Sequence, residues 1–244
     1  MGFLLSSLAG LSTMIGMVPI LFRIRQEDKL IAGSLAFAAG VMLCVSITDL
    51  LPEAFSMLTS ARMGKFSIIL VFLFVNIGMI ATSFVEKGIH LNDKNSSLYQ
   101  VGIISMLAII LHNIPEGIAT FLSTSKSTSL GLSLAIAIAL HNIPEGISIS
   151  VPIYYSTGKK TKAFFYTFIS ALSEPLGAVL TYLFLKDFVN NTVLGLLFAF
   201  IAGVMIFISF GELIPTSRKY FYQKISRIWF IIGILFMLIK FFLF

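Results

Sequence analysis

Residues 99–122 read YQVGIISMLAIILHNIPEGIATFL, and this stretch decides the class of fold. It is longer than the roughly 20 apolar residues that a helix needs to cross the hydrocarbon core of a bilayer. Its only charged side chain at neutral pH, Glu116, and its only histidine, His112, stand near its middle. We therefore predict a transmembrane helix that carries polar groups deep in the membrane.

The composition of the whole chain fits the same environment. Hydrophobic residues make up 57% of the 244 positions and charged residues only 11%, whereas a soluble domain carries about 25% charged residues. The net charge of +6 comes from Lys and Arg scattered between apolar runs, so we expect no nucleic-acid partner. The single Cys44 excludes a disulfide framework and a thiolate metal cluster.

The apolar stretches predict an all-α polytopic membrane protein, because open sheet edges and irregular backbone cannot face lipid. The first stretch has no basic n-region, so we expect a retained helix rather than a signal peptide. One transmembrane domain should cover residues 1–244. We expect eight helices, at about residues 2–22, 30–55, 66–85, 99–122, 130–153, 163–185, 192–214 and 228–244.

The basic residues predict the orientation. Twelve lie in the connections after the first, third, fifth and seventh helices, namely Arg23, Arg25, Lys29, Lys87, Lys94, Lys159, Lys160, Lys162, Arg218, Lys219, Lys224 and Arg227. The other five, on the opposite side, are Arg62, Lys65, Lys126, Lys186 and Lys240. Because cytoplasmic loops carry the excess of Lys and Arg, we expect a multi-pass cell-membrane protein with both termini outside the cytoplasm.

Two stretches of the chain resemble each other. AFAAGVMLCVSITDLLP (36–52) aligns without gaps to AFIAGVMIFISFGELIP (199–215), and Asp49 falls on Glu212. The first copy lies on the second predicted helix and the other on the seventh, which runs in the opposite direction. This indicates an inverted repeat, typical of transporters that alternate access around a midplane site. Chance similarity between Gly/Ala-rich helices is the weaker interpretation.

A second repeat carries the chemistry. HNIPEGI occurs at 112–118 and again at 141–147. Histidine and glutamate four residues apart lie on one helix face, and a short connection makes the two helices antiparallel neighbours. His112, Glu116, His141 and Glu145 should therefore meet near the bilayer centre, with Asn113 and Asn142 beside them. Imidazole plus carboxylate suits zinc and its first-row neighbours better than Mg²⁺ or Ca²⁺.

Buried carboxylates strengthen this interpretation. No Lys or Arg is placed deep enough to neutralise Glu116, Glu145 and Glu174, and a charge at the bilayer centre costs about 2.5–3.5 kcal/mol or more. With histidine beside them, a metal cation is the natural partner. Asp49, Glu53 and Glu212 lie in or at the ends of other spans, and their role in the pathway stays open. A structural kink would explain one HNIPEG motif, but not two copies and a further glutamate.

HNIPEG on two successive helices followed by E-P-L-G at 174–177 resembles the ZIP (Zrt/Irt-like) divalent metal transporters, over essentially the whole chain and closest to the bacterial ZupT-type branch. The resemblance implies uptake of zinc into the cytosol, and also of Fe²⁺, Mn²⁺, Co²⁺ or Cd²⁺, with no cofactor. It implies that helices 1, 4, 5 and 6 slide against helices 2, 3, 7 and 8. Unlike many members of that family, the chain has a short connection after the third helix, with only His90.

The same resemblance implies a two-metal site between helices 4, 5 and 6. One metal would bind His112, Glu116, His141 and Glu145. The second would bind Asn113, Glu116, Asn142, Glu145 and Glu174, so that both motif glutamates bridge the two ions.

Two other classes of function compete with this one. An intramembrane metalloprotease usually needs HEXXH, which is absent from the sequence. A proton-coupled carrier of an organic solute would use the glutamates as relay groups, but the duplicated His–Asn–Glu pattern favours metal. The sequence does not rank the metals, does not say whether protons drive transport, and leaves open whether a homodimer forms.

Overall fold

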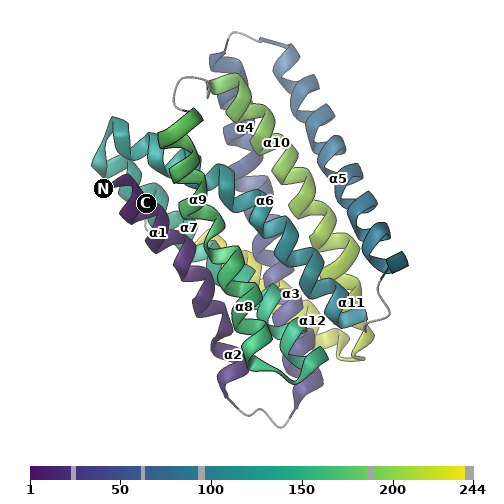
Figure 1. Cartoon of the computed structure of the whole chain (residues 1–244). Coiled ribbons are helices and arrows are strands. Elements are labelled where there is room, and N and C mark those ends of the chain that lie inside the picture. The colour runs from purple at the N-terminus through teal and green to yellow at the C-terminus, as the bar shows by residue number, and fades with distance from the viewer. Residues whose placement is uncertain (23–25, 62–63, 93–96, 186–189, 240–244) are drawn as a thin grey trace.

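The computed structural model describes residues 1–22, 26–61, 64–92, 97–185 and 190–239. These residues form eight helical segments without a strand (Figure 1). In chain order they are α1–η1–α2 (Gly2–Ser12, Thr13–Met17, Val18–Leu21), α3–η2–α4 (Glu27–Val45, Ser46–Leu50, Leu51–Ser60), α5 (Phe66–Asn92), α6 (Ser97–Lys126), α7 (Thr128–Thr157), α8–α9–η3 (Lys160–Ala171, Ser173–Leu180, Thr181–Leu185), α10–η4–α11 (Asn191–Phe207, Ile208–Leu213, Ile214–Lys219) and α12 (Gln223–Leu238). The prediction of an all-α polytopic protein is confirmed.

Seven of the predicted spans coincide with helices that are long and apolar enough to cross a membrane. The eighth, 228–244, overlaps α12, whose 16 residues extend about 24 Å, and its predicted last part lies outside the described residues. The predicted helix ends are less accurate. α5 runs on to Asn92 and α12 begins at Gln223, because polar residues such as Glu86 and Lys87 are good helix formers even where they end an apolar run.

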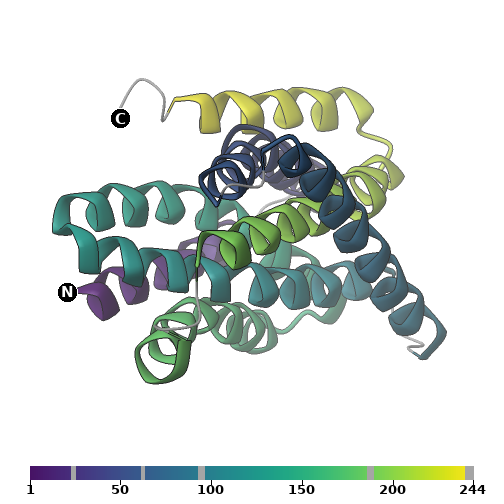
Figure 2. The same ribbon diagram turned by 90° about the horizontal axis from the view of Figure 1, so that it is seen from above.

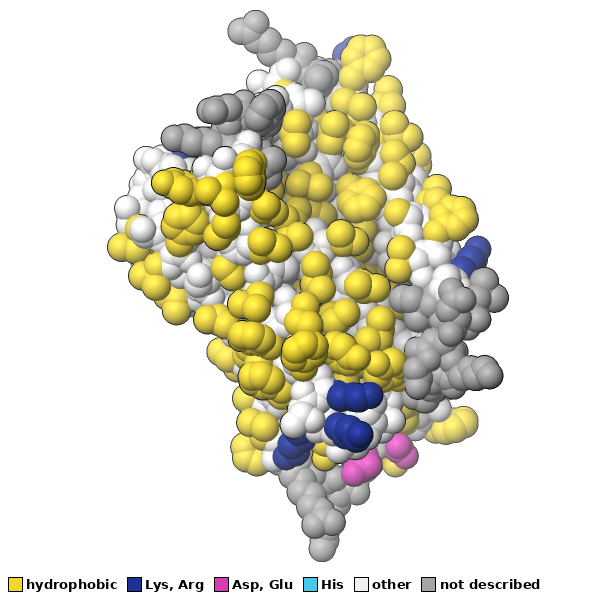
Figure 3. Space-filling model, in the orientation of Figure 1, with side chains coloured by type: hydrophobic (Ala, Val, Ile, Leu, Met, Phe, Trp, Pro, Cys, Tyr) yellow, Lys and Arg dark blue, Asp and Glu magenta, His cyan; other side chains and the backbone are white. Residues whose placement is uncertain are grey.

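The ends of the helical segments gather at two ends of the bundle (Figure 1). The C-terminal ends of α4 and α6 and the starts of α5 and α7 lie at the end nearer the N-terminus, which we call the amino end. The C-terminal ends of α2, α5, α7 and α11 and the starts of α3, α6, α8 and α12 lie at the other, which we call the basic end. Large apolar side chains cover much of the face between them in Figure 3, where Lys, Arg, Asp and Glu are concentrated toward the basic end. Such an apolar surface is what lipid requires.

The helices divide into two groups held together by glycine contacts. The first group, which we call the site group, holds α1–η1–α2, α6, α7 and α8–α9–η3. In it, a Cβ on Gly117 of α6 would overlap the carbonyl oxygen of Glu174, and one on Gly177 of α9 would overlap that of Ile114. Gly146 of α7 and Gly16 of η1 approach each other's backbone in the same way. Because only glycine lets two backbones come this close, these contacts fasten α6 to α9 and α7 to the first segment.

The support group holds α3–η2–α4, α5, α10–η4–α11 and α12. Its helices are also joined by close contacts between glycines and neighbouring backbones. Gly40 of α3 packs on the carbonyl oxygen of Phe230 on α12, and Gly233 of α12 packs on that of Phe37 on α3. Gly78 of α5 and Gly203 of α10 form an equivalent pair. In Figure 2, α12 and α8 lie at opposite edges of the bundle. The two copies of the 36–52 and 199–215 repeat thus place Gly40 and Gly203 in matching helix contacts.

Each copy of that repeat also contains a π-helical turn. η2 holds Asp49 and η4 holds Glu212. The turns precede Pro52 and Pro215, which lack the N–H that would bond the carbonyl four residues back, and this favours a locally widened helix. The segments run in opposite directions (Figure 1). This shared local structure supports the inverted repeat predicted from the sequence.

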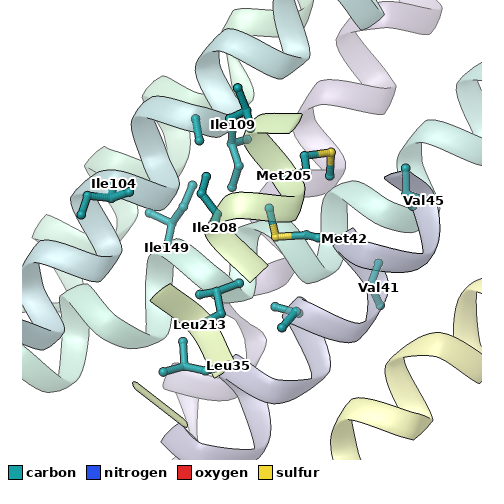
Figure 4. Close-up of a cluster of buried hydrophobic side chains, with 14 of the residues drawn as sticks. Leu35, Val41, Met42, Val45, Ile104, Ile109, Ile149, Met205, Ile208 and Leu213 are labelled. Atoms are coloured by element: carbon teal, nitrogen blue, oxygen red, sulfur yellow. The ribbon is translucent and has the colours of Figure 1, made fainter. Parts of the chain in front are cut away.

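A cluster of buried apolar side chains joins the two groups. Figure 4 shows side chains of α3, α6, α7, α10 and η4 converging, among them Met42, Ile109, Ile149, Met205 and Ile208. Ile109 precedes His112 on α6, which starts at the basic end, and Ile149 follows Glu145 on α7, which ends there. The cluster therefore lies on the basic-end side of the HNIPEG motifs.

Candidate metal centre

The two HNIPEG motifs face each other across the antiparallel helices α6 and α7. Nε2 of His141 lies 2.9 Å from Oε1 of Glu116, and Nε2 of His112 lies 3.2 Å from the same oxygen. Nε2 of His112 is also 3.5 Å from Oε1 of Glu145. The i, i+4 spacing within each motif brings the four side chains into one cluster, as the sequence predicts.

These separations match a metal site. Ligand atoms placed tetrahedrally at about 2.1 Å from Zn²⁺ lie about 3.4 Å apart, close to the measured nitrogen–oxygen distances. One ligand atom each from His112, His141 and Glu145 lies within 4.8 Å of the others. A cation can therefore bind between these groups with only small side-chain movements, replacing the short contact between His141 and Glu116.

The cluster is almost entirely excluded from solvent. His112, Glu116, His141 and Glu145 are each at most 5% exposed. Both oxygens of Glu145, Oε2 of Glu116 and both ring nitrogens of His112 have no hydrogen-bond partner among the described residues. Buried polar atoms without a partner are costly. A bound cation would supply the missing partner to the oxygens and to one ring nitrogen of the histidine.

A second set of ligands adjoins the first. The Nδ2 group of Asn142 donates to the carbonyl oxygen of Ala9 at 2.9 Å and to Oε2 of Glu174 at 3.0 Å. Its carbonyl oxygen, Oδ1, is left without a hydrogen-bond partner in the described part of the chain, as are Oε1 of Glu174 and Oδ1 of Asn113. Three further buried oxygen acceptors are thus available, and they come from α6, α7 and α9.

The sequence did not reveal the role of the first segment. The carbonyl oxygen of Ala9 accepts a hydrogen bond from the Asn142 amide. A Cβ added to Gly10 would lie only 2.5 Å from the carbonyl oxygen of Ala171, so the two backbones are in close contact there. Ser12 contacts α7 through the Ala139 carbonyl at 3.1 Å. The signal is the set of small residues Ala9, Gly10 and Ser12, which indicates close helix packing but does not identify the partner.

Comparison with known proteins identifies the family. The sequence matches the family described as "ZIP Zinc transporter" over residues 2–97 and 92–240. The chain belongs to the ZIP family. It is 39% identical to the zinc transporter ZupT of Clostridium perfringens, with 100% of this chain and 96% of the relative aligned. It is 40% identical to the zinc transporter ZupT of Streptococcus mutans, with 99% and 97% aligned. The family consists of transporters, so the protein is not an enzyme.

A cavity leads to the candidate metal centre of this ZIP protein. It has a volume of about 340 Å³, and Glu116 and His141 contribute to its wall. The opposite wall includes Asp49 of η2 and Glu53 of α4. Ala119 and Ser123, which follow Glu116 on α6, also line it, so the cavity extends from the motifs toward the amino end. The residues whose role the sequence left open, Asp49 and Glu53, thus lie along an approach to the site.

Glu212 lies elsewhere. It is 5% exposed, in η4 of the support group, and its Oε1 has no hydrogen-bond partner among the described residues. It does not line the cavity that reaches Glu116. The repeat therefore places Asp49 on the approach from the amino end, whereas its counterpart Glu212 is buried away from that approach.

Proposed function

We propose that this ZIP protein carries Zn²⁺ into the cytosol through a two-metal site between α6, α7 and α9, and that residues 1–244 form one transport domain. The observation that carries the proposal is the set of buried, unpartnered oxygens on Asn113, Glu116, Asn142, Glu145 and Glu174. The first metal would bind His112 and His141 with the two motif glutamates. The second would bind oxygen ligands alone, and the glutamates would bridge the two ions.

The ligand set also bears on the choice of metal. Imidazole nitrogen suits Zn²⁺, Co²⁺ and Fe²⁺, while a site built from carboxylate and amide oxygens suits Mn²⁺. We therefore include Fe²⁺, Mn²⁺, Co²⁺ and Cd²⁺ as candidate cargo beside Zn²⁺. The relatives are described as zinc transporters, and this supports Zn²⁺ as the leading candidate.

The cavity and the apolar cluster suggest which state the structure represents. The path from the amino end reaches Glu116 and His141, whereas buried apolar residues such as Met42, Ile109 and Ile208 fill the space toward the basic end. With the basic end in the cytoplasm, both termini are extracytoplasmic and the metal centre is open to the outside of the cell membrane. Release to the cytosol then requires the apolar cluster to separate.

The glycine contacts suggest how that happens. All four pairs lie within the site group or within the support group, so each group can move as a unit. All seven proposed metal ligands belong to the site group. Sliding of the site group along the support group would move the metal from the acidic cavity, lined by Asp49 and Glu53, past the apolar cluster.

The rival functions fit the geometry less well. A metalloprotease needs a general base beside an open metal position with room for a peptide, and here the glutamates are themselves close to both histidines. A carrier of organic anions would need a buried cationic group, and no Lys or Arg is among the buried residues that the structure describes.

Reconstituted vesicles test the proposal. Purified protein in proteoliposomes should move Zn²⁺ down its gradient, and the panel should include Mn²⁺, Fe²⁺, Co²⁺, Cd²⁺ and Mg²⁺, with and without a pH gradient. Glu27→Gln is the matched control for site variants, because Glu27 is an exposed acid far along the chain from the motifs. If no divalent transition metal moves while the control protein is folded, the proposal is wrong.

A further inference from the structure

A second, chemically different cavity lies between η4–α11 and α12. It has a volume of about 500 Å³, within the range of ligand-binding pockets. Its apolar walls are Phe210 and Ile214 on one side and Phe230 and Ile231 on the other. Arg218 and Arg227 complete its lining. None of the proposed metal ligands contributes to it, so it is separate from the transport site.

A buried hydrogen bond fixes the two arginines relative to each other. The hydroxyl oxygens of Ser217 and Ser226 lie 2.6 Å apart, and the Ser217 hydroxyl also lies 2.8 Å from the carbonyl oxygen of Ala32 on α3. Arg218 and Arg227 are the residues that follow these serines. The bond between the serines therefore holds both arginines at the lining of one cavity.

The arginines have no acidic partner within the described ranges of the chain. Both are exposed, and no carboxylate among the residues that the structure describes forms an ion pair with either. A guanidinium group binds phosphate with two parallel hydrogen bonds and tolerates an apolar surrounding better than an ammonium group. Two such groups at an apolar cavity attract an anion and repel metal ions.

The surrounding aromatic residues indicate the depth of this cavity in a bilayer. Phe221, in the α11–α12 connection, is 93% exposed and has a φ of 60°, a conformation that is unusual for a bulky residue. Trp229 is 44% exposed, and Nζ of Lys29 lies 5.4 Å from the centre of the Tyr222 ring. Tryptophan, tyrosine and lysine in this arrangement are typical of the membrane–water interface, where phospholipid headgroups lie.

We propose that this cavity binds an anionic phospholipid. The phosphate of the lipid lies between Arg218 and Arg227, and one acyl chain lies along Phe210, Ile214, Phe230 and Ile231. Basic pockets between transmembrane helices on the cytoplasmic side are suited to such headgroups. Both α11 and α12 belong to the support group, so the lipid anchors the support group in the membrane. This last consequence rests on the proposed transport function, whereas lipid binding itself does not.

Native mass spectrometry of the purified full-length chain tests the proposal. The protein is titrated with phosphatidylglycerol and, separately, with phosphatidylcholine of the same acyl chains. Phosphatidylglycerol should remain bound in the mass spectrum, and in a separate thermal-unfolding measurement it should raise the melting temperature of the protein. Phosphatidylcholine should do neither. Arg218→Gln with Arg227→Gln should weaken phosphatidylglycerol binding by about thirtyfold. Lys87→Gln with Lys159→Gln removes two exposed charges at the same end, outside the cavity, and should leave binding unchanged.

Three results would overturn it. They are equal binding of phosphatidylcholine, unchanged binding by the double Gln variant, and equal weakening by the lysine control. A parallel titration with inorganic phosphate distinguishes a soluble anion, because phosphate alone should not reproduce the shift in melting temperature. Arg218→Lys with Arg227→Lys keeps the charge and should bind with intermediate affinity. Metal flux is not a readout here, so failure of the transport proposal would leave these outcomes unaffected.

Discussion

Oε1 of Glu116 lies within 3.2 Å of Nε2 of both His112 and His141. One carboxylate oxygen of α6 is therefore shared by a histidine of its own helix and one of α7. The cluster lies where the cavity from the amino end reaches the site group. Glu116 is the residue through which the ligands of the two helices are connected.

Glu116→Gln should nearly abolish metal uptake, because it keeps the side-chain shape but removes the charge from the shared ligand. Loss of an outer-shell partner costs about 10–100-fold in metal affinity, and loss of this ligand should cost more. Glu145→Gln should have a similar effect. Uptake is measured in proteoliposomes, with folding checked by size-exclusion chromatography. Wild-type rates in a folded Glu116→Gln protein would mean that the transported metal binds elsewhere.

Glu174→Ala should reduce the metal bound per chain without eliminating it. In the proposed arrangement Glu174 serves the oxygen-only site, and the imidazole site stays intact. The measurement is elemental analysis of protein equilibrated with Zn²⁺ and freed of loose metal, with Asn113→Ala as a second test of the same site. Complete loss of metal from Glu174→Ala, with the fold intact, would argue against two separable sites.

Gly117→Ala should destabilise the protein. The added Cβ would overlap the Glu174 carbonyl, and overpacking typically costs about 1–3 kcal/mol. Gly88→Ala is the control, because among the described residues no atom from outside its own stretch of helix lies within 4 Å of its would-be Cβ, and alanine favours the helix. Thermal unfolding in detergent should show a lower melting temperature for Gly117→Ala only. Equal melting temperatures would show that the glycine contact between α6 and α9 is not tight.

Apparent Zn²⁺ affinity should fall as the external pH is lowered. Metal binding needs neutral imidazole and ionised carboxylate, so protons compete with the metal, and a free histidine has a pKa of about 6.5. Affinity is therefore highest above that pH and declines below it. His112→Ala with His141→Ala should flatten the decline in this range and favour Mn²⁺ over Zn²⁺. An unchanged pH profile in the double variant would exclude the histidines as ligands.

Single cysteines test the orientation. In a Cys44→Ser background, a cysteine at position 126 should react with a membrane-impermeant reagent added to intact cells, and one at position 160 should not. Both side chains are exposed, at opposite ends of the bundle. The reverse labelling pattern would place the basic end outside and would reverse the proposed direction of uptake.

The sequence predicts the helical segments and the cluster on α6 and α7 because both depend on short-range regularities. Apolar length indicates a span, and i, i+4 spacing brings His112 and Glu116 onto one face. The π-turns around Asp49 and Glu212 are a shift of one hydrogen bond, which leaves the hydropathy pattern unchanged. The hydrogen bond from Asn142 to the Ala9 carbonyl joins residues far apart in the chain. Reciprocal pairs such as Gly40 and Gly233 likewise need the packed helices to be known.

The two-metal site between α6, α7 and α9 is tested most directly by a structure determined from crystals grown with Zn²⁺, with anomalous scattering measured at the zinc edge. The proposed site should give one peak among His112, Glu116, His141 and Glu145. A second peak should be bounded by Asn113, Asn142 and Glu174, with the two glutamates between the ions. Anomalous peaks confined to Asp49 and Glu53, or no peak between α6, α7 and α9, would contradict it.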